Sequence, residues 1–411
     1  MKLLSISAEL PPFNSGGYEV GAWRVSHQLQ KQFGIEVYLL TSMRGVETGL
    51  HLGEQNCYRI LPRPGCDVRG KTYIPHQNPQ RTQRQRQLAL QIMREMVETI
   101  QPDAVLFWQV FSWSLYSLQI LDDLKQKGIP FYLYSSAFEL PWFSMVSIQS
   151  LWQAQRWSSL SKYLRVYFGL WRRGALPERV DINWSHVAFC SQWLQQKHIE
   201  LDFPAHTSQV IHWGIDIPSF VPTQSPRNPG PLRLLWASRI CRDKGLHVVI
   251  DALTQLPPGS CVLDIYGHED DQAYIEPLYG QVKEANLEAD IQFKGFIQSD
   301  ELRRQMPYYD AFILSSIWQE PFSIVLLEAA AAGLALIATL TGGTPEILSE
   351  RNAVVYEAEN PKQLAQKIQQ LIDEPDRLEH LKRMAFERAK LFSMETMIQK
   401  VYQWIAAGKN S

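Results

Sequence analysis

The sequence predicts an α/β protein with two domains, each a doubly wound parallel sheet. Short apolar runs suited to buried parallel strands alternate with helical patterns along the chain. The stretch 223–231 (TQSPRNPGP) holds three prolines and one glycine, a composition that breaks both helix and strand. A length of 411 residues is enough for one to three domains. The stretch is therefore predicted to link two Rossmann-like halves.

The N-terminal half begins with MKLLSISAEL, which has a short apolar core and no small-residue cleavage site. This pattern indicates a first β-strand rather than a signal peptide. The predicted strands of this half are 2–7, 36–41, 104–107, 131–134 and 187–190. The predicted helices are 18–32, 83–100, 114–127 and 151–172.

The C-terminal half alternates more regularly. Its predicted strands are 232–238, 261–266, 291–294, 311–315, 335–339 and 353–356. Its predicted helices are 245–256, 272–286, 299–306, 322–332, 344–349 and 361–373. We predict an N-terminal domain at 1–212 and a C-terminal domain at 213–390. A last helix within 391–411 is expected to pack back on the N-terminal domain.

The bulk composition excludes several classes of function. A net charge of −2 and a pI near 6.6 provide no electrostatic basis for binding nucleic acid. No run approaches the ~18 apolar residues that a membrane-spanning helix needs. The five cysteines form no C-x-x-C pair and no zinc spacing, so they are predicted to be reduced thiols in a cytosolic protein. No metal site is expected.

The segment WQEPFSIVLLEAAAAG places Glu320 and Glu328 around an uncharged run that follows a strand and enters a helix. Pro321 suits the first helical turn, where the N–H groups of 322–325 would form a binding platform for anions or hydroxyls. A carboxylate on so apolar a helix is costly unless it is paired, and a polyhydroxylated ligand would supply hydrogen-bond donors. In the alternative without a ligand, Glu320 caps the helix and Glu328 pairs with an internal arginine.

Two further loops have the composition of ligand-binding loops. Arg239 and Lys244 follow a strand and precede Gly245, which suits a diphosphate approached closely by the backbone. Gly16 and Gly17, between the first strand and the first helix, permit close approach to a phosphate or a sugar. A solvated charged loop and a simple tight turn are the respective alternatives. The third glycine of the dinucleotide fingerprint is missing, which disfavours a nicotinamide dehydrogenase.

Together these motifs resemble the retaining glycosyltransferases of the GT-B fold, in family 4 (glycosyl transferases group 1). The opening LLSISAELPPFNSGGYEVGAWRVSHQL is similar to the first βαβ unit of that family, and VIHWGIDIPSF to a later stretch. LLWASRICRDKGLHVVIDAL resembles its Arg…Lys-Gly motif. EPFSIVLLEAAAAGLALIATLTGGTPEIL resembles its E-x7-E motif with the downstream Gly-Gly-x-Pro-Glu. The resemblance implies two Rossmann-like domains that face a central cleft.

The resemblance also implies roles for individual residues. Glu328 would bind the ribose hydroxyls of a nucleotide sugar, and Glu320 would contact the transferred sugar. The groups that hold the diphosphate would be the side chains of Arg239 and Lys244 and the main-chain N–H groups near Ile324 and Val325. The remaining contacts would be Phe322 and Ser323 at the sugar, the backbone of Gly295, Phe296 and Ile297 near the base, and Gly16 and Gly17 at the phosphates.

The implied activity moves a sugar from a UDP- or GDP-sugar to a saccharide or lipid-linked acceptor, with retention of anomeric configuration. No metal or other cofactor is implied, and polysaccharide or glycolipid assembly in the cytoplasm is the expected setting. Within enzymes, the alternatives are a nucleotide-sugar hydrolase and a 2-epimerase. Outside enzymes, the alternative is a catalytically silent nucleotide-sugar-binding or scaffold protein.

The sequence departs from the family on the acceptor side. Many members carry histidines after a strand that begins Pro-Asp, whereas here the stretch from Pro102 to Gln109 has none. The next strand ends in Ser135 and Ser136, again without histidine, and Ser323 stands where glycine is frequent. These changes leave an inactive relative as an open alternative.

Residues 150–175 combine basic residues with an aromatic stripe at helical spacing. Such a helix binds an anionic membrane surface or a lipid-linked acceptor. The prediction is a peripheral contact with the inner face of the membrane, and a buried core helix is the alternative.

Overall fold

The computed structural model describes residues 1–11, 17–43, 56–62, 79–108, 119–136, 168, 182–200, 203–218, 230–269 and 271–408. The chain forms two compact units. Unit 1 comprises Met1–His212 and Met397–Ser411, and unit 2 comprises Trp213–Thr396. Most of the predicted linker, Gly16 and, apart from Phe168, the predicted helix at 151–172 lie outside the described residues.

Unit 1 contains a seven-stranded parallel sheet with the order β3-β2-β1-β4-β5-β6-β7. The strands are β1 (Lys2–Ser7), β2 (Glu36–Ser42), β3 (Cys57–Leu61), β4 (Ala104–Trp108), β5 (Phe131–Ser135), β6 (Val187–Phe189) and β7 (Gln209–Val210). The described helices of this unit are α1 (Gly17–Phe33), α2 (Pro79–Ile100), α3 (Gln119–Gln126), α6 (Gln192–Ile199) and most of α13 (Met394–Ala407).

Strands β3 and β7 were not predicted. β7 has two residues, too few to show any periodicity. β3 is an edge strand that carries a buried arginine, Arg59, whose guanidinium donates to the carbonyls of Leu10 (3.1 Å) and Pro11. The charged residue interrupts the apolar run by which a strand is identified in the sequence.

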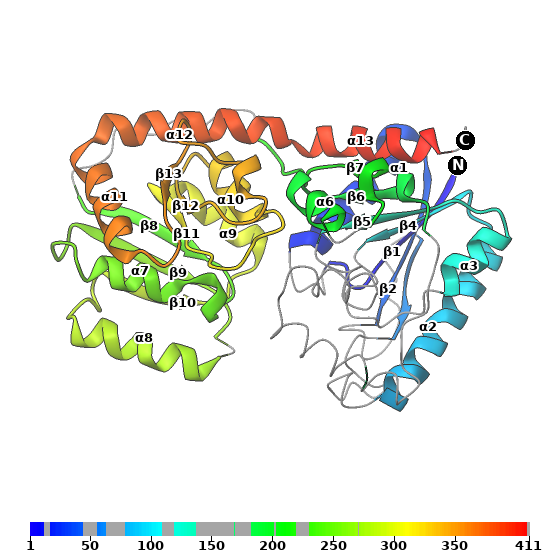
Figure 1. Ribbon diagram of the computed structural model, residues 1–411, viewed down its shortest axis with the longest axis horizontal. Coiled ribbons are helices and arrows are strands. Elements are labelled where there is room, and N and C mark those ends of the chain that lie inside the picture. The colour runs from blue at the N-terminus through cyan, green and yellow to red at the C-terminus, as the bar shows by residue number, and fades with distance from the viewer. Residues whose placement is uncertain are drawn as a thin grey trace. The chain divides into compact units, whose positions relative to one another are not determined.

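The last helix, α13, is anchored on unit 1 by three contacts. The ring of Tyr402 stacks on Phe33 of α1, with centroids 3.9 Å apart. The Tyr132 hydroxyl of β5 donates to the carbonyl of Ile405 at 2.9 Å. The indole N–H of Trp404 donates to the carbonyl of Ser185 at 3.0 Å. Figure 1 shows α13 running beside α1, so both ends of the chain belong to the same unit.

His198 on α6 is a buried titratable group in the core of unit 1. Its side chain is fully buried, its ring lies 4.5 Å from that of Phe189, and Nδ1 lies 2.8 Å from the carbonyl oxygen of Leu194. Burial disfavours the charged imidazolium and lowers its pKa to about 4, although the Leu194 carbonyl opposes that shift. The imidazole is therefore neutral at pH 7.

This histidine predicts a pH dependence of stability. Its pKa is depressed in the folded state, so the unfolded chain, with a pKa near 6.5, binds the proton more readily. Stability is complete above about pH 6.5 and falls as the pH drops toward 4, by about 3 kcal/mol from this group. Urea unfolding at pH 7.5 and pH 4.5 measures this decrease in the free energy of unfolding. The His198→Gln variant should lack the part of the decrease that comes from the histidine. An equal fall in the variant would contradict this prediction.

Unit 2 contains a six-stranded parallel sheet with the order β10-β9-β8-β11-β12-β13. The strands are β8 (Leu232–Ala237), β9 (Cys261–Tyr266), β10 (Ile291–Gly295), β11 (Ala311–Leu314), β12 (Ala335–Thr339) and β13 (Val354–Tyr356). The helices are α7 (Leu246–Leu253), α8 (Gln272–Glu284), α9 (Ser299–Gln305), α10 (Ile324–Ala331), α11 (Pro361–Asp373) and α12 (Pro375–Ala389). The predicted helix at 344–349 is a single 3-10 turn, Thr344–Glu346.

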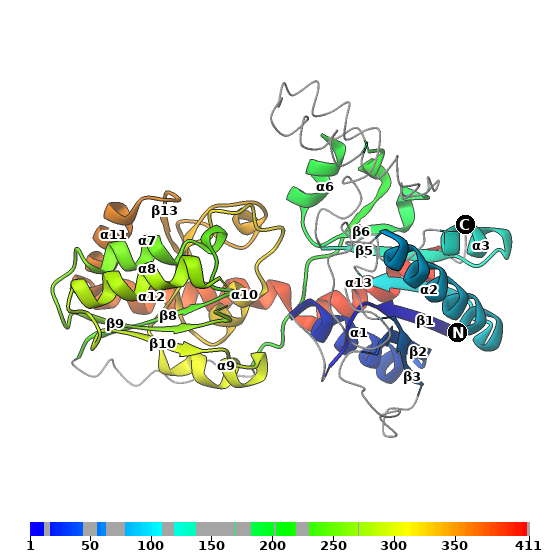
Figure 2. The same ribbon diagram turned by 90° about the horizontal axis from the view of Figure 1, so that it is seen from below.

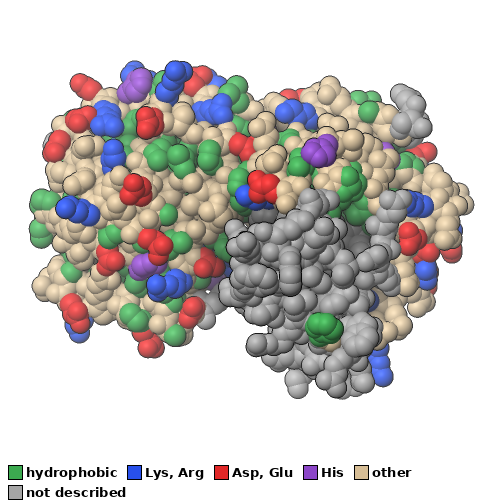
Figure 3. Space-filling model, viewed as in Figure 1, with side chains coloured by type: hydrophobic (Ala, Val, Ile, Leu, Met, Phe, Trp, Pro, Cys, Tyr) green, Lys and Arg blue, Asp and Glu red, His purple; other side chains and the backbone are tan. Residues whose placement is uncertain are grey.

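Helices cover both faces of this second sheet. α7 packs with α8 and α11, and α10 packs with α12, which also lies against β12. Figure 1 shows α12 above the strands and α8 below them, and Figure 2 shows the same unit from below. The central strands β8 and β11 are accordingly buried, as expected of a parallel sheet covered on both faces. On the visible surface of this unit, acidic and basic side chains are interspersed (Figure 3).

Candidate functional site

The strand order of unit 2 reverses between β8 and β11. β9 and β10 follow β8 toward one edge of the sheet, whereas β11, β12 and β13 extend toward the other. The segment after β8 therefore leads to α7 on one face, and the segment after β11 leads to α10 on the opposite face. Open parallel sheets bind ligands beyond the carboxyl ends of the strands at such a switch point. Both predicted motifs of this domain lie there.

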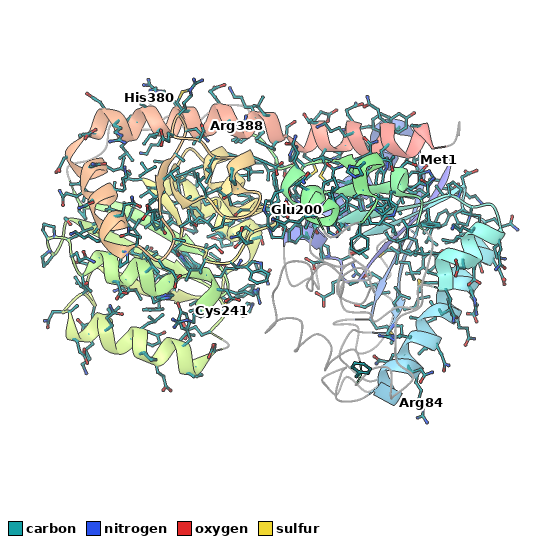
Figure 4. The ribbon with its side chains drawn as sticks, in the orientation of Figure 1. Met1, Arg84, Glu200, Cys241, His380 and Arg388 are labelled. Carbon is teal, nitrogen blue, oxygen red and sulfur yellow. The ribbon has the colours of Figure 1, made fainter. Side chains whose placement is uncertain are left out.

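The segment after β8 holds the two predicted cations. Arg239 is exposed, and among the described residues its guanidinium forms no hydrogen bond or ion pair. Cys241, labelled in Figure 4, precedes a 3-10 turn, Arg242–Lys244. Gly245 follows with φ +69°, and a Cβ there would lie 2.1 Å from the carbonyl oxygen of Ser315. Only glycine allows this turn to pack so closely against the end of β11.

Lys244 and Glu320 form an ion pair across the switch point. Lys244 Nζ bonds to Glu320 Oε1, and the two side chains are 15% and 12% exposed. The hydroxyl of Ser316 donates to the same oxygen at 2.6 Å. The carboxylate predicted to contact a sugar and the cation predicted to bind a diphosphate are thus adjacent, although they are 76 residues apart.

Hydrogen bonds cross-link the two segments behind this pair. The N–H groups of Ile317 and Trp318 donate to the carbonyl of Asp243 at 2.9 and 3.1 Å. The Ser315 hydroxyl donates to the carbonyl of Lys244 at 2.8 Å and accepts the indole N–H of Trp236 at 2.9 Å. These hydrogen bonds fix the backbone on both sides of the ion pair. Such support from neighbouring groups preorganises a binding site.

The turn after β12 also holds the segment around Glu320 in place. The N–H of Gly343 donates to the Glu320 carbonyl at 2.7 Å, and the N–H of Gly342 donates to Oε1 of Gln319 at 2.9 Å. Gly342 has φ +61°, and a Cβ there would lie 2.1 Å from the Glu320 carbonyl oxygen. This contact explains the first of the two glycines that follow the E-x7-E motif in the sequence.

Helix α10 begins later than predicted. It starts at Ile324 with Ser323 as its N-cap, so Pro321 lies outside the first turn and the predicted start at 322 is wrong. Ser323 and Phe322 retain extended or irregular backbone because the preceding segment is bonded to the turn after β12. The Ser323 side chain does not cap the helix. The first-turn N–H groups of Ile324 and Val325 therefore have no partner within the helix, the arrangement that binds anions.

Glu328 lies one helical turn further along α10 and is paired with an arginine. Nη1 of Arg303 donates to Glu328 Oε1 at 2.7 Å, and the side chains are 25% and 12% exposed. The alternative in which Glu328 meets an internal arginine therefore describes the structure without ligand. Sequence reasoning missed Arg303, because nothing in its local pattern distinguishes it from Arg304 next to it.

Two aromatic groups flank the segment. Phe322 is buried, and its ring centroid lies 5.8 Å from that of Phe392, over which Arg388 of α12 is placed (Figure 4). Phe296 is 52% exposed and stacks on His268 with centroids 3.9 Å apart. Phe296 follows Gly295 of β10, which has φ +72°. It thus presents an aromatic face at the carboxyl end of the same sheet, next to Ile297.

The predicted residues of unit 1 are less fully described. Gly17 is the first residue of α1, and Gly16 and Gln109 lie outside the described residues. Trp108 is buried, and its indole N–H donates to the Ser5 hydroxyl at 3.0 Å. Ser135 and Ser136 are also buried, at the end of β5. Trp108, Ser135 and Ser136 are therefore packed in the core of unit 1.

Within the described residues, neither a clustered metal site nor a membrane-spanning helix is found. No cluster of three or more His, Cys, Asp or Glu side chains has the arrangement of a metal site within those residues. Within the same residues, none of the helices combines the length and the apolar character needed to cross a bilayer. The predicted membrane-contact segment at 150–175 lies outside this description, apart from Phe168.

Comparison with known proteins places the site in a family context. Residues 220–388 match the glycosyl transferases of group 1. The matched range contains β8 to α12 and all the site residues of unit 2. Glycogen synthase of Mycobacterium tuberculosis is 29% identical over 252 residues, which are 58% of this chain and 60% of that protein. The chain spans about half the length of the curated relatives it matches.

Solved structures resemble the whole chain. Sucrose-phosphate synthase from Thermosynechococcus elongatus superimposes with a TM-score of 0.74 and 20% identity, covering 100% of both chains. HepE of Anabaena, in complex with UDP, superimposes with a TM-score of 0.70 and 19% identity, covering 99% of this chain and 100% of that one. The two parallel-sheet units are the Rossmann-like domains of a GT-B fold, which confirms the predicted fold class.

Proposed function

We propose that this protein is a retaining glycosyltransferase of family 4 that transfers a sugar from a nucleoside diphosphate to a saccharide or lipid-linked acceptor. The observation that carries the proposal is the Lys244–Glu320 ion pair at the switch point of unit 2. It joins a cation suited to a diphosphate with a carboxylate suited to sugar hydroxyls. Helix α10 begins four residues after Glu320 and carries Glu328 on its second turn.

Each group has a role in the proposed reaction. Arg239, Lys244 and the first-turn N–H groups of α10 bind the diphosphate and stabilise the charge that it gains as it leaves. Glu320 accepts hydrogen bonds from the transferred sugar. Glu328 accepts hydrogen bonds from the ribose. No metal or other cofactor is part of this proposal.

The bond changes follow from retention without an enzyme nucleophile. The bond between the anomeric carbon and the diphosphate oxygen breaks through an oxocarbenium-like transition state. The acceptor oxygen bonds to the anomeric carbon on the same face, and its hydroxyl proton passes to the departing diphosphate. Positive charge at Arg239 and Lys244 lowers the barrier because it compensates the phosphate charge where it develops.

The nucleotide is proposed to be UDP rather than GDP. HepE, which shares the fold, has been crystallised with UDP and with UDP-glucose. The exposed ring of Phe296, supported by His268, offers a flat surface beside the segment proposed to lie near the base. Acceptor binding is proposed for unit 1, in the cytoplasm, with residues 150–175 at the inner face of the membrane.

Calorimetric titration of UDP, GDP and ADP into the purified protein tests the proposal. We expect selective binding of UDP, weakened about 10–100-fold by Glu328→Ala, because hydrogen bonds to a charged group are lost. Glu284→Ala, which removes an exposed carboxylate from the end of α8, is the matched control and should bind normally. Absence of binding to folded wild-type protein would contradict the assignment of the nucleotide site.

Product analysis separates the alternatives. Incubation with UDP-sugars should yield a transferred glycoside when an acceptor saccharide is present. Free sugar alone would indicate a hydrolase, and an epimerised nucleotide sugar would indicate an epimerase. Binding without any turnover would indicate the catalytically silent protein.

A further inference from the structure

We propose that Arg303 positions Glu328 for the ribose of the sugar donor and thereby sets the affinity for the nucleotide. This inference rests on the proposed function and deepens it. Arg303 belongs to α9 and Glu328 to α10, so the contact joins two helices of unit 2. Arg303 acts through Glu328 and is a positioning residue.

The contact has the geometry of a charge-assisted hydrogen bond. Nη1 of Arg303 lies 2.7 Å from Oε1 of Glu328, within the short range expected for such bonds. The other terminal nitrogen of Arg303 pairs with Asp300, which is 72% exposed. The guanidinium thus extends from a solvent-exposed acid on its own helix to a largely buried acid on the next.

Burial makes this arginine important for Glu328. The carboxylate is 12% exposed, and the side chains around it on α10 are apolar: Leu326, Leu327, Ala329, Ala330 and Ala331. A charge in such surroundings is costly unless it is paired. Arg303 compensates that charge in the absence of nucleotide. Its planar guanidinium, held by Asp300 at the other terminal nitrogen, also fixes the direction from which Nη1 approaches Glu328, which a flexible ammonium group does less well.

Pairing with Arg303 is compatible with binding a ribose. The two oxygens of an ionised carboxylate together accept about four hydrogen bonds. A bond from Arg303 to Oε1 therefore leaves capacity for the hydroxyl donors of a vicinal diol. Because the carboxylate is already oriented, less conformational entropy is lost when the ribose binds.

Helix α9, which carries Arg303, lies directly after the segment proposed to contact the base. Helix α9 begins at Ser299, two residues after the segment 295–297 that is proposed to lie near the base. The helix that carries Arg303 therefore follows the segment proposed to lie near the base directly in the sequence, while its arginine contacts the carboxylate proposed to bind the ribose.

Two neighbouring arginines provide a matched experiment. Arg304 lies beside Arg303 on α9, but it is 71% exposed and pairs with Glu301 at 2.9 Å. We expect Arg303→Gln to weaken UDP binding about 10-fold and Arg304→Gln to leave it unchanged. Calorimetry measures both affinities, and urea unfolding checks that each variant remains folded.

A ribose analogue separates positioning from a general structural effect. With 2′,3′-dideoxy-UDP, which lacks both hydroxyls, Arg303→Gln should bind as wild type does. In the Glu328→Gln background, Arg303→Gln should change the UDP affinity by less than about 2-fold, because the two side chains act as a unit. Arg303→Lys, which keeps the charge without the fork, should fall between wild type and Arg303→Gln.

Three results would overturn the inference. If the Arg303→Gln variant bound UDP as tightly as wild type does, the arginine would have no positioning role. Equal losses for UDP and the dideoxy analogue would show a structural role only. Additive losses with Glu328→Gln would show that the two residues act independently. If wild-type protein bound no nucleotide, the proposed function itself would be wrong. The wild-type titration alone shows this, whereas the Arg303 variants test only the role of the arginine.

Discussion

Replacing Lys244 by methionine is expected to lower the rate of sugar transfer by about 10²–10³-fold. The methionine retains the length of the side chain but removes the charge that compensates the departing diphosphate, and loss of one such electrostatic group typically costs this much. It also removes the ion-pair partner of Glu320, which is 12% exposed and retains its bond from Ser316. Release of UDP from a UDP-sugar in the presence of acceptor measures the rate.

Two companion variants make this result specific. Lys390→Met breaks a lysine–glutamate pair of the same unit whose side chains are 45% and 56% exposed, and it should not change the rate. Lys244→Arg restores the charge and should recover part of the activity. Equal rates for Lys244→Met and wild type would exclude Lys244 from stabilising the leaving group. An unfolding midpoint near that of wild type for each variant establishes that the comparison is between folded proteins.

Replacing Gly342 by alanine is expected to lower the free energy of unfolding by about 3 kcal/mol or more. The added Cβ would lie 2.1 Å from the Glu320 carbonyl oxygen and 2.7 Å from its backbone nitrogen, so backbone has to move. The residue also has φ +61°, where an L side chain is strained. Strain and overpacking each cost about 1–3 kcal/mol. Displacement of Glu320 should abolish transfer even in protein that remains folded.

Gly259 is the matched control for this second prediction. It has φ +74°, but a Cβ there would meet nothing within 4 Å. Gly259→Ala should therefore cost only the conformational strain, about 1–2 kcal/mol, and leave transfer intact. Urea unfolding, monitored by tryptophan fluorescence, gives the free energy of unfolding of the two variants. Equal losses of stability would mean that the contact with Glu320 has no energetic consequence.

Much of the fold was predictable because buried parallel strands have a strong local signal. β1, β9 and β12 have the predicted bounds, and the predictions for β8 and β11 differ only at their ends. In β8, β9, β11 and β12 at most one residue is polar or charged, so a run of four to six letters is sufficient to identify them. The edge strand β3, which carries Arg59, and the two-residue β7 lack such a run and were missed.

The start of α10 shows a limit of local reasoning. Proline in the first helical turn is a sound general signal, and it supported a helix predicted to start at 322, directly after Pro321. Hydrogen bonds from Gly342 and Gly343 instead hold the segment around Glu320 in a non-helical conformation, and the helix starts at Ile324. Two hydrogen bonds, each made from 23 residues away in the sequence, decided the boundary.

The sequence by itself determined which residue types are present at the ends of the strands, and therefore where a ligand site was to be sought. It predicted Arg239 and Lys244 because two cations on a loop that enters a helix suit a diphosphate. It predicted Glu320 and Glu328 because carboxylates around so apolar a helix are costly unless they are paired or hydrogen-bonded. Only the tertiary structure decided their partners: Lys244 with Glu320 across 76 residues, and Arg303 with Glu328 across 25. Periodicity reports which face of an element is buried, whereas ion pairing depends on which elements the sheet brings side by side.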